Sequence, residues 1–230
     1  MAKTIIITGA NGNLGTAVVK KFLSENYKVL AVDQHDNHLA FATGNPLFAW
    51  QAINLASEKE SEAFIQKSVN DHKQVHGGLF LAGGFAMGGF EDTDGETIKK
   101  MFSLNFETAY YMARPLFLHM LQQDYGRIVF VGARPALQPE AGKDMIAYAL
   151  SKSLLFKLAD LLNKQAKGKN VVASVIVPST IDTSVNRESM PKANPGDWVK
   201  AEQIAEVLEF VCSDKGLPIR EAVYKIYNNA

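Results

Sequence analysis

Short, continuous apolar runs alternate with helical patterns along the whole chain. The apolar runs are rich in β-branched residues and are bounded by polar or glycine-containing segments, which is typical of buried strands. The intervening segments place apolar residues three or four positions apart, as Leu14, Val18 and Phe22 do. The predicted strands are residues 3–8, 28–33, 48–55, 75–81, 127–131, 171–177 and 222–226, and the predicted helices are residues 14–24, 57–72, 95–123, 144–167 and 201–212.

This alternation predicts an α/β fold in which parallel strands are joined by right-handed helical crossovers. We expect one domain over residues 1–230, because no segment has the composition of a linker and no repeat is visible. Ser57 is a candidate N-cap, and Pro115 is a candidate kink in the long helix. In such doubly wound sheets, ligands bind beyond the carboxyl ends of the strands.

Composition and charge narrow the function classes. The 230 residues are 47% hydrophobic, an ordinary value for a globular protein with a substantial core. Lys and Arg together number 24 and balance 24 Asp and Glu. This balance gives no overall electrostatic reason to expect binding to nucleic acid or to an anionic membrane.

The cysteine and histidine content and the absence of targeting patterns bear on disulfides, metal sites and cellular location. The single cysteine, Cys212, excludes an intramolecular disulfide and a thiolate zinc cluster, and its apolar helical setting favours a buried packing role. The five histidines show no metal-ligand spacing with nearby carboxylates, so no metal site is expected. We see neither a signal-peptide pattern nor a membrane-spanning apolar run, and we expect a cytoplasmic protein.

A glycine-rich turn joins the first predicted strand to the first predicted helix. Gly9, Gly12 and Gly15 form a GxxGxxG pattern there. Glycines permit the tight turn and a close approach of the backbone to a pyrophosphate, which the helix N-terminus can then bind. A purely structural turn is the alternative. The candidate cofactor-binding residues in this turn are Gly9, Asn11, Gly12, Asn13, Leu14 and Gly15.

Acidic and small residues at the next strand ends extend the candidate cofactor site. Asp33 ends the second predicted strand, where a carboxylate can accept hydrogen bonds from ribose hydroxyls and repel a 2′-phosphate. No arginine occurs in residues 34–37, so NAD(H) is favoured and NADP(H) stays open. Further candidates are Asn54 and Leu55 for the adenine, and Ala82, Gly83 and Gly84 for a close backbone approach to the cofactor.

A tyrosine and a lysine lie four residues apart in a predicted helix. Tyr148 and Lys152 therefore share one side of that helix. A nearby ammonium lowers the pKa of a phenol, whose ordinary value is about 10, and so prepares it for proton transfer. An incidental amphipathic pair is the alternative interpretation.

Taken together, these motifs resemble the short-chain dehydrogenase/reductase family over nearly the whole chain. The resemblance implies a single Rossmann-type, doubly wound parallel sheet of about seven strands, with helices on both faces. It implies that Tyr148 is the proton donor, that Lys152 holds the nicotinamide ribose, and that Asn105 supports a relay water. It also places the segment after the sixth strand near the nicotinamide, with Pro178, Thr180 and Thr183 as candidate contacts.

The chain departs from the standard family pattern at three places. Asn13 stands where standard members carry glycine, and Leu81 stands where they carry asparagine. The catalytic serine expected after the fifth strand is replaced by Gly132 or Ala133. Losing a donor to a developing oxyanion typically costs about 2.7–4 kcal/mol, which argues against ordinary carbonyl chemistry.

One branch of the family, the quinonoid dihydropteridine reductases, is a closer resemblance. Residues 132–137 resemble its serine-free segment, and residues 82–89 resemble its glycine-rich turn. Residues 180–191 together with Trp198 resemble its segment after the sixth strand. A quinonoid pterin is already strongly electrophilic, so its reduction needs less oxyanion stabilisation. Asn105 departs from the pattern of that branch.

Residues 179–199 form a long segment that we expect to be a substrate loop or lid, with Arg187, Met190 and Trp198 as candidate residues that cover the substrate.

The predicted function is NADH-dependent reduction of a small electrophile, with a quinonoid dihydropteridine as one candidate. The alternatives are reduction of ordinary carbonyl substrates and a non-catalytic NAD-binding redox sensor. By family analogy we expect a homodimer or homotetramer, paired through the helices at 95–123 and 144–167.

Overall fold

The computed structural model describes residues 2–229, whose seven strands form one parallel sheet. The strand order is β3-β2-β1-β4-β5-β6-β7, so the expected α/β, doubly wound architecture is confirmed. The strands are β1 (Thr4–Thr8), β2 (Lys28–Asp33), β3 (Phe48–Ala52), β4 (Gly77–Phe80), β5 (Tyr125–Val131), β6 (Asn170–Pro178) and β7 (Val223–Ile226).

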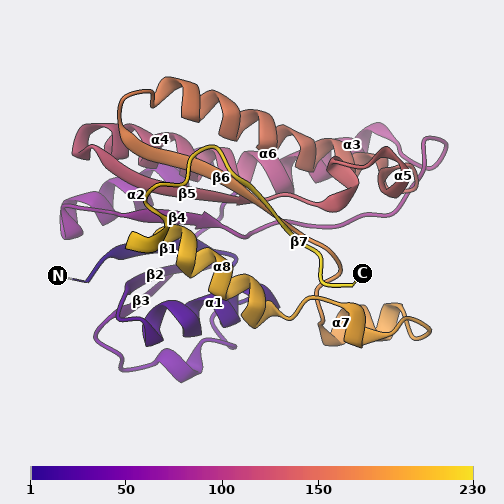
Figure 1. The fold of residues 1–230 in the computed structure, drawn as a ribbon, viewed down its shortest axis with the longest axis horizontal. Helices are drawn as coiled ribbons and strands as arrows, with labels where there is room; N and C mark the ends of the chain where they lie inside the picture. Colours follow the sequence, from indigo (N-terminus) through magenta and orange to yellow (C-terminus); the bar gives the residue numbers. More distant parts are fainter. Residues whose placement is uncertain (1, 230) are drawn as a thin grey trace.

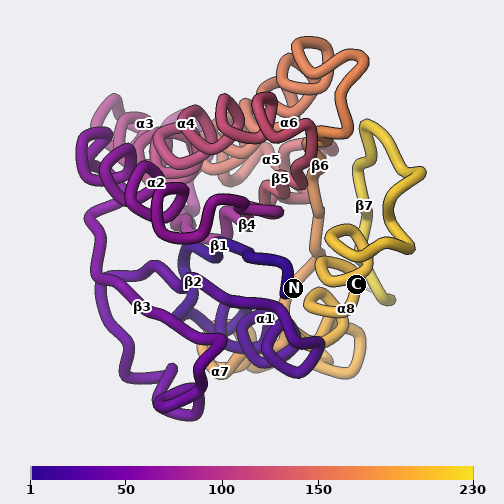
Figure 2. The backbone as a smooth tube through the Cα atoms, turned by 90° about the vertical axis from the view of Figure 1, so that its left-hand side faces the viewer, coloured from indigo at the N-terminus to yellow at the C-terminus, as the bar shows by residue number. Residues whose placement is uncertain are grey.

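Helices cover both faces of the sheet, and each face has its own core (Figure 1). On one face lie α2 (Glu58–His72), α4 (Thr108–Gln123) and α6 (Ile146–Gln165). On the other face lie α1 (Asn13–Ser24) and α8 (Ala201–Cys212). Figure 2 shows β3 and β7 at the two edges of the sheet.

The burial of β1 explains why the strands have continuous apolar sequences. Successive side chains of a strand point to opposite faces. Ile6 accordingly packs in the core beneath α4, whereas Ile5 and Ile7 pack in the core beneath α1 and α8. Both faces of β1 are covered, so all three isoleucines are fully buried. Cys212 is also buried, and its expected packing role is confirmed.

The long helix expected over residues 95–123 is three segments. It consists of α3 (Gly95–Phe102), a π-helical turn η2 (Ser103–Glu107) and α4. The interruption thus surrounds Asn105, while Pro115 lies inside α4. Single π turns within α-helices occur frequently at functional sites.

Several other boundaries differ by a few residues from the predicted ones. The third strand ends at Ala52, because the chain turns there to bring Ile53 and Leu55 into the core beneath α2. Two short helices, α5 (Pro139–Gly142) and α7 (Ser184–Ser189), were not predicted, because each is too short to show a periodic pattern. Ser57 caps α2 as expected by accepting the backbone N–H of Glu60 at 3.3 Å.

Residues 2–229 contain neither a candidate membrane span nor a candidate metal cluster. No helix there is both long enough and apolar enough to cross a membrane. No three His, Cys, Asp or Glu side chains gather where they could hold a metal ion.

Candidate active site

The candidate site lies where the chain reverses its direction of travel across the sheet, between β1 and β4. Gly9 follows β1 with φ +65, in the left-handed region that favours glycine. A Cβ at Gly9 would come within 2.7 Å of the backbone nitrogen of Ala82, which follows β4. A Cβ at Gly15 would lie 2.0 Å from the carbonyl oxygen of Gly9. Both glycines are therefore required by close backbone packing.

The N-terminus of α1 is suited to bind a phosphate. Within the described chain, no side chain caps this helix at Gly12, and its first turn carries no acidic residue. The first N–H groups of a helix lack intrahelical partners, and the helix dipole is positive at this end. An uncapped helix that follows a glycine turn at the carboxyl edge of the sheet fits the pyrophosphate of a dinucleotide.

Asp33, at the carboxyl end of β2, is held against the glycine turn. Its Oδ2 accepts the backbone N–H of Asn11 at 2.9 Å, and its Oδ1 accepts that of Gln34 at 2.7 Å. Each carboxylate oxygen retains a lone pair for a ribose hydroxyl. The Asn11 side chain also binds the following loop, donating to Asn37 Oδ1 at 2.9 Å and accepting the N–H of His38 at 2.7 Å.

The two candidates for the adenine lie in different environments. Asn54 is exposed just beyond β3, and its Oδ1 accepts the N–H of Ala56 at 3.1 Å. Leu55 instead packs into the core beneath α2. Asn54 is therefore the better placed of the two to meet a ligand at the surface.

Asn105 connects three separate parts of the site. Its buried Oδ1 accepts the backbone N–H of Gly84 at 2.9 Å, and its Nδ2 donates to Ser151 Oγ at 3.0 Å. The Ser151 hydroxyl donates in turn to the carbonyl oxygen of Tyr148 at 2.8 Å. These bonds join η2, the turn after β4 and the first half of α6.

The side chains of Lys152 and Asn105 both lie close to Gly83. The Lys152 ammonium is buried and donates to the carbonyl oxygen of Val131 at 2.9 Å. A Cβ at Gly83 would lie 2.5 Å from Asn105 Oδ1 and 3.2 Å from Lys152 Nζ. The structure thus brings together Asn105, Tyr148 and Lys152 beside the turn after β4, as the sequence motifs predict.

Burial determines the protonation of this pair. It raises the pKa of Tyr148 to about 12 and lowers the pKa of Lys152 to about 8. The lowered tyrosine pKa expected from the sequence is therefore wrong for this structure, where burial disfavours the charged phenolate. Lys152 Nζ lies 6.0 Å from the centre of the Tyr148 ring. A phenol with this pKa is protonated at neutral pH and suits a proton donor better than a base.

The structure distinguishes the two positions considered for the missing serine. A Cβ at Gly132 would lie 2.7 Å from Phe156 Cζ and 2.8 Å from Val175 Cγ1, so a side chain there would enter the core. This leaves Ala133, which follows β5, as the candidate position of the missing serine. A methyl group supplies no hydrogen bond to a developing oxyanion.

The residues predicted to contact the nicotinamide lie at the end of β6 and at the start of the segment that follows it. Pro178 is the last residue of β6, Thr180 follows it, and the Thr183 hydroxyl caps α7 by accepting the N–H of Asn186 at 3.1 Å. Pairing of Ile181 with Val199 closes the base of this segment.

Two of the expected substrate covers in this segment make contacts within the protein. Trp198 is only 5% exposed, and its carbonyl oxygen accepts from Asn228 at 3.0 Å. It therefore anchors the base of the segment. Arg187 is paired with Asp182 through two hydrogen bonds of 2.6 and 2.8 Å. Met190 is partly exposed.

Two residues of the site have contacts that sequence reasoning missed. Ser151 orients the Asn105 amide, and its position between Tyr148 and Lys152 was a usable signal. Phe85 packs its ring against that of Tyr148, with centroids 5.0 Å apart. No local pattern links these two rings, because they lie on different elements.

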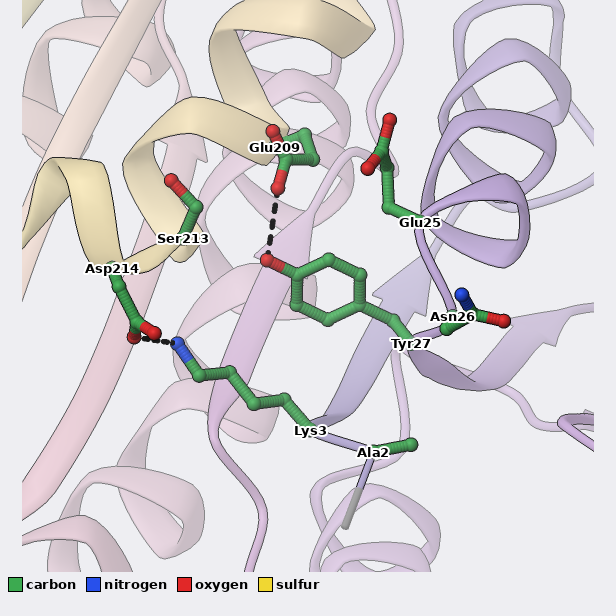
Figure 3. Close-up of a pocket in the computed structure, with 8 residues that line it drawn as sticks. All are labelled: Ala2, Lys3, Glu25, Asn26, Tyr27, Glu209, Ser213 and Asp214. Atoms are coloured by element: carbon green, nitrogen blue, oxygen red, sulfur yellow. Dashed lines mark hydrogen bonds and ion pairs between the residues drawn. The ribbon is translucent and has the colours of Figure 1, made fainter.

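A cavity of about 420 Å³ lies at the opposite, amino-terminal ends of β1 and β2 (Figure 3). Lys3 forms an ion pair there with Asp214 at 2.6 Å, and the Tyr27 hydroxyl donates to Glu209 at 3.0 Å. Its carboxylates would repel phosphates, and parallel sheets bind ligands at their carboxyl edge. This cavity is therefore separate from the candidate active site.

Comparisons with known proteins agree with this geometry. The short chain dehydrogenase family profile matches residues 3–194. Dihydropteridine reductase of Dictyostelium discoideum is 30% identical over 212 residues, which are 90% of this chain and 87% of that protein. The 2,3-dihydro-2,3-dihydroxybenzoate dehydrogenase of Escherichia coli (strain K12) is 26% identical over 185 residues, 80% of this chain and 72% of that protein.

A solved structure shows the same fold. The structure of ElxO with NADP bound superposes with a TM-score of 0.90, covering 98% of this chain and 97% of that one at 18% identity. With the family profile, the glycine turn and the Asn105, Tyr148 and Lys152 cluster in agreement, the chain belongs to the short-chain dehydrogenase/reductase family of NAD(P)-binding oxidoreductases.

Proposed function

We propose that this protein reduces a small, strongly electrophilic substrate with NADH, and that a quinonoid dihydropteridine is such a substrate. The observation that carries the proposal is the combination of an assembled Tyr148 and Lys152 with a methyl group at Ala133. Such a site can deliver a proton but lacks the usual hydroxyl donor to an oxyanion. The similarity to dihydropteridine reductase of Dictyostelium discoideum supports the pterin as the first substrate to test.

The residues of the chain have distinct tasks in this reaction. A nicotinamide held at this site would supply the hydride. Tyr148 donates the accompanying proton, and the Lys152 ammonium stabilises the phenolate that remains. The Asn105 side chain joins η2 to the turn after β4 and to α6 through two hydrogen bonds, so that Tyr148 and Lys152 keep their positions. Proton and hydride together complete a two-electron reduction.

The preference for NADH rests on Asp33 and the loop that follows it. Two backbone N–H groups orient the Asp33 carboxylate at the end of β2. Residues 34–38 contain neither arginine nor lysine to neutralise a 2′-phosphate. A phosphate beside this carboxylate would meet a like charge, which favours NADH over NADPH. Asn54 is the proposed contact for the adenine, and Pro178, Thr180 and Thr183 are the proposed contacts near the nicotinamide.

The test is the oxidation of NADH, followed by its absorbance, with quinonoid dihydropterin generated in situ. NADPH and a simple ketone are tested in parallel. We expect rapid oxidation that favours NADH and the pterin. Tyr148→Phe should lose turnover by at least about 10²-fold, within the range of general acid catalysis, while NADH still binds.

Two results would contradict this function. Turnover that survives in Tyr148→Phe would remove the tyrosine from the mechanism. Tight NADH binding without turnover of any electrophile would instead support a redox sensor.

We also propose that the protein is a homodimer or homotetramer. The support is the exposed apolar surface on the helices of one face, including Tyr110 and Leu118 on α4 and Leu150 and Leu161 on α6. Light scattering coupled to size-exclusion chromatography measures the mass directly. A mass of about 25.2 kDa, that of one chain, at micromolar concentration would contradict the proposal.

A further inference from the structure

An aromatic ring from the turn after β4 packs against the candidate proton donor. The rings of Phe85 and Tyr148 have centroids 5.0 Å apart and an interplanar angle of 72°, an edge-to-face arrangement. Aromatic pairs prefer this geometry because the positive edge of one ring meets the negative face of the other. Phe85 thus restricts the orientation of the phenol from a separate element of the fold.

The segment that carries Phe85 is fastened to the start of α6, which carries Tyr148. The Gly88 N–H donates to the carbonyl oxygen of Asp144 at 2.8 Å, and the Ile146 N–H donates to the Gly88 carbonyl at 3.0 Å. The Thr93 hydroxyl lies within hydrogen-bonding distance of the Gly88 carbonyl, at 3.1 Å, and of the Gly89 carbonyl, at 2.7 Å. Gly88 has φ +139, a conformation that side chains rarely adopt. The contact between the two rings is therefore supported by backbone bonds on both sides.

Much of this aromatic surface stays uncovered. Phe85 is 59% exposed, and Met87 on the same segment is 63% exposed. Both are apolar, and thioethers pack well against aromatic rings. Ligand sites are commonly lined by apolar and aromatic side chains with a few placed polar groups. Phe85 supplies such a lining beside Tyr148, and Met87 adds exposed apolar surface on the same segment.

We propose that Phe85 is both a positioning residue for Tyr148 and a specificity-determining residue, whose open surface packs against a flat, conjugated ring of the substrate. The proposal rests on the proposed function and deepens it, because it predicts selection of ring electrophiles over small aliphatic ketones. Leucine at this position would keep an apolar side chain but lose the flat face and the edge-to-face contact.

The kinetic test compares Phe85→Leu with the matched control Phe90→Leu. Phe90 lies on the same segment but is 85% exposed, so its replacement changes little besides solvated surface. In Phe85→Leu we expect kcat/KM for the ring electrophile to fall by about tenfold, the upper range for an aromatic pair, while kcat/KM for an aliphatic ketone falls much less. NADH binding should be unchanged in both variants. Equal losses for the two substrates would overturn the specificity role.

A second measurement does not depend on turnover. The ultraviolet absorbance of the Tyr148 tyrosinate is followed as the pH is raised. Subtracting the titration curve of Tyr148→Phe from that of the parent isolates this signal. The same subtraction is made in the Phe85→Leu and Phe90→Leu proteins, each with and without Tyr148→Phe. Burial holds the pKa of Tyr148 well above the ordinary value for a phenol. Replacing the Phe85 ring admits water, so this pKa should fall toward about 10 in Phe85→Leu and stay unchanged in Phe90→Leu.

An unchanged titration in Phe85→Leu would overturn the positioning role, whatever the activity. If the parent protein reduces no electrophile, the proposed function fails, and the titration alone still decides whether Phe85 positions Tyr148. The two failures are therefore distinguishable.

Discussion

At the scale of single residues, the most consequential feature is the methyl group of Ala133. It lies just beyond β5, next to Gly132, whose hydrogen faces Phe156 and Val175 in the core. The core leaves no room for a side chain at Gly132, so Ala133 is the candidate position of the missing serine. In the proposed function, the absent hydroxyl favours substrates that already accept a hydride readily.

Ala133→Ser should therefore broaden the substrate range. A correctly placed donor to an oxyanion is worth about 10²–10³ in rate, so we expect at least about a tenfold gain in ketone reduction and little change with a quinonoid substrate. Steady-state rates with both substrates measure this. Gly132→Ser serves as the control, because its side chain would collide with the core and should lower stability without any gain. No gain in Ala133→Ser would show that the missing serine does not limit ketone reduction.

At the scale of elements, Asn105 holds the site together. Its amide bonds to the turn after β4 and to Ser151 on α6, while its own backbone belongs to the π turn between α3 and α4. An α-helical continuation would rotate the residues after η2 relative to α3. The π turn is therefore part of how the chain presents this amide.

Asn105→Ala should destabilise the fold as well as the site. It leaves the Gly84 N–H without its acceptor, a loss that costs about 1–3 kcal/mol. It also removes the donor to the Ser151 hydroxyl, which keeps its bond to the Tyr148 carbonyl. Urea unfolding should show a lower midpoint with an unchanged slope. Thr108→Val is the matched control, since it removes only a bond to Leu104 within the same helical segment. Equal midpoints for Asn105→Ala and the parent would contradict this role.

At the scale of the whole molecule, the two ends of the sheet have different tasks. The carboxyl edge carries the candidate chemistry, whereas the amino edge carries contacts that join distant segments. There His76 Nδ1 accepts the backbone N–H of Thr4 at 3.0 Å, linking the start of β1 to the segment before β4. Burial, followed by the charge of Lys3, lowers the pKa of His76 from its ordinary value of 6.5.

This histidine should make the protein less stable in acid. Because the folded pKa lies below the unfolded value of 6.5, the unfolded state binds the proton more readily. The contribution to the free energy of unfolding is complete above that pH and is lost as the pH falls through 6.5 toward the folded pKa. Urea unfolding measured between neutral and mildly acidic pH should show a shallower decline for His76→Asn. Parallel curves for the two proteins would rule out this contribution.

The sequence by itself determined the order and type of most elements and the positions of the main motifs. Local apolar patterns predicted all seven strands, because strands inside a sheet that is covered on both faces are apolar along most of their length. The glycine turn and the pair Tyr148 and Lys152 were visible because their chemistry depends on residues close together in the chain. Parallel strands then bring their carboxyl ends to one edge, so the location of the site followed from the motifs.

Only the tertiary structure decided the features that depend on burial and on contacts between distant segments. It favoured Ala133 over Gly132 as the serine position, set the π turn around Asn105 and joined Phe85 to Tyr148. It also reversed the expected direction of the Tyr148 pKa, because desolvation depends on every element packed around the phenol. Spacing along the chain cannot reveal such effects, since they arise from the packing of residues that the sequence keeps far apart.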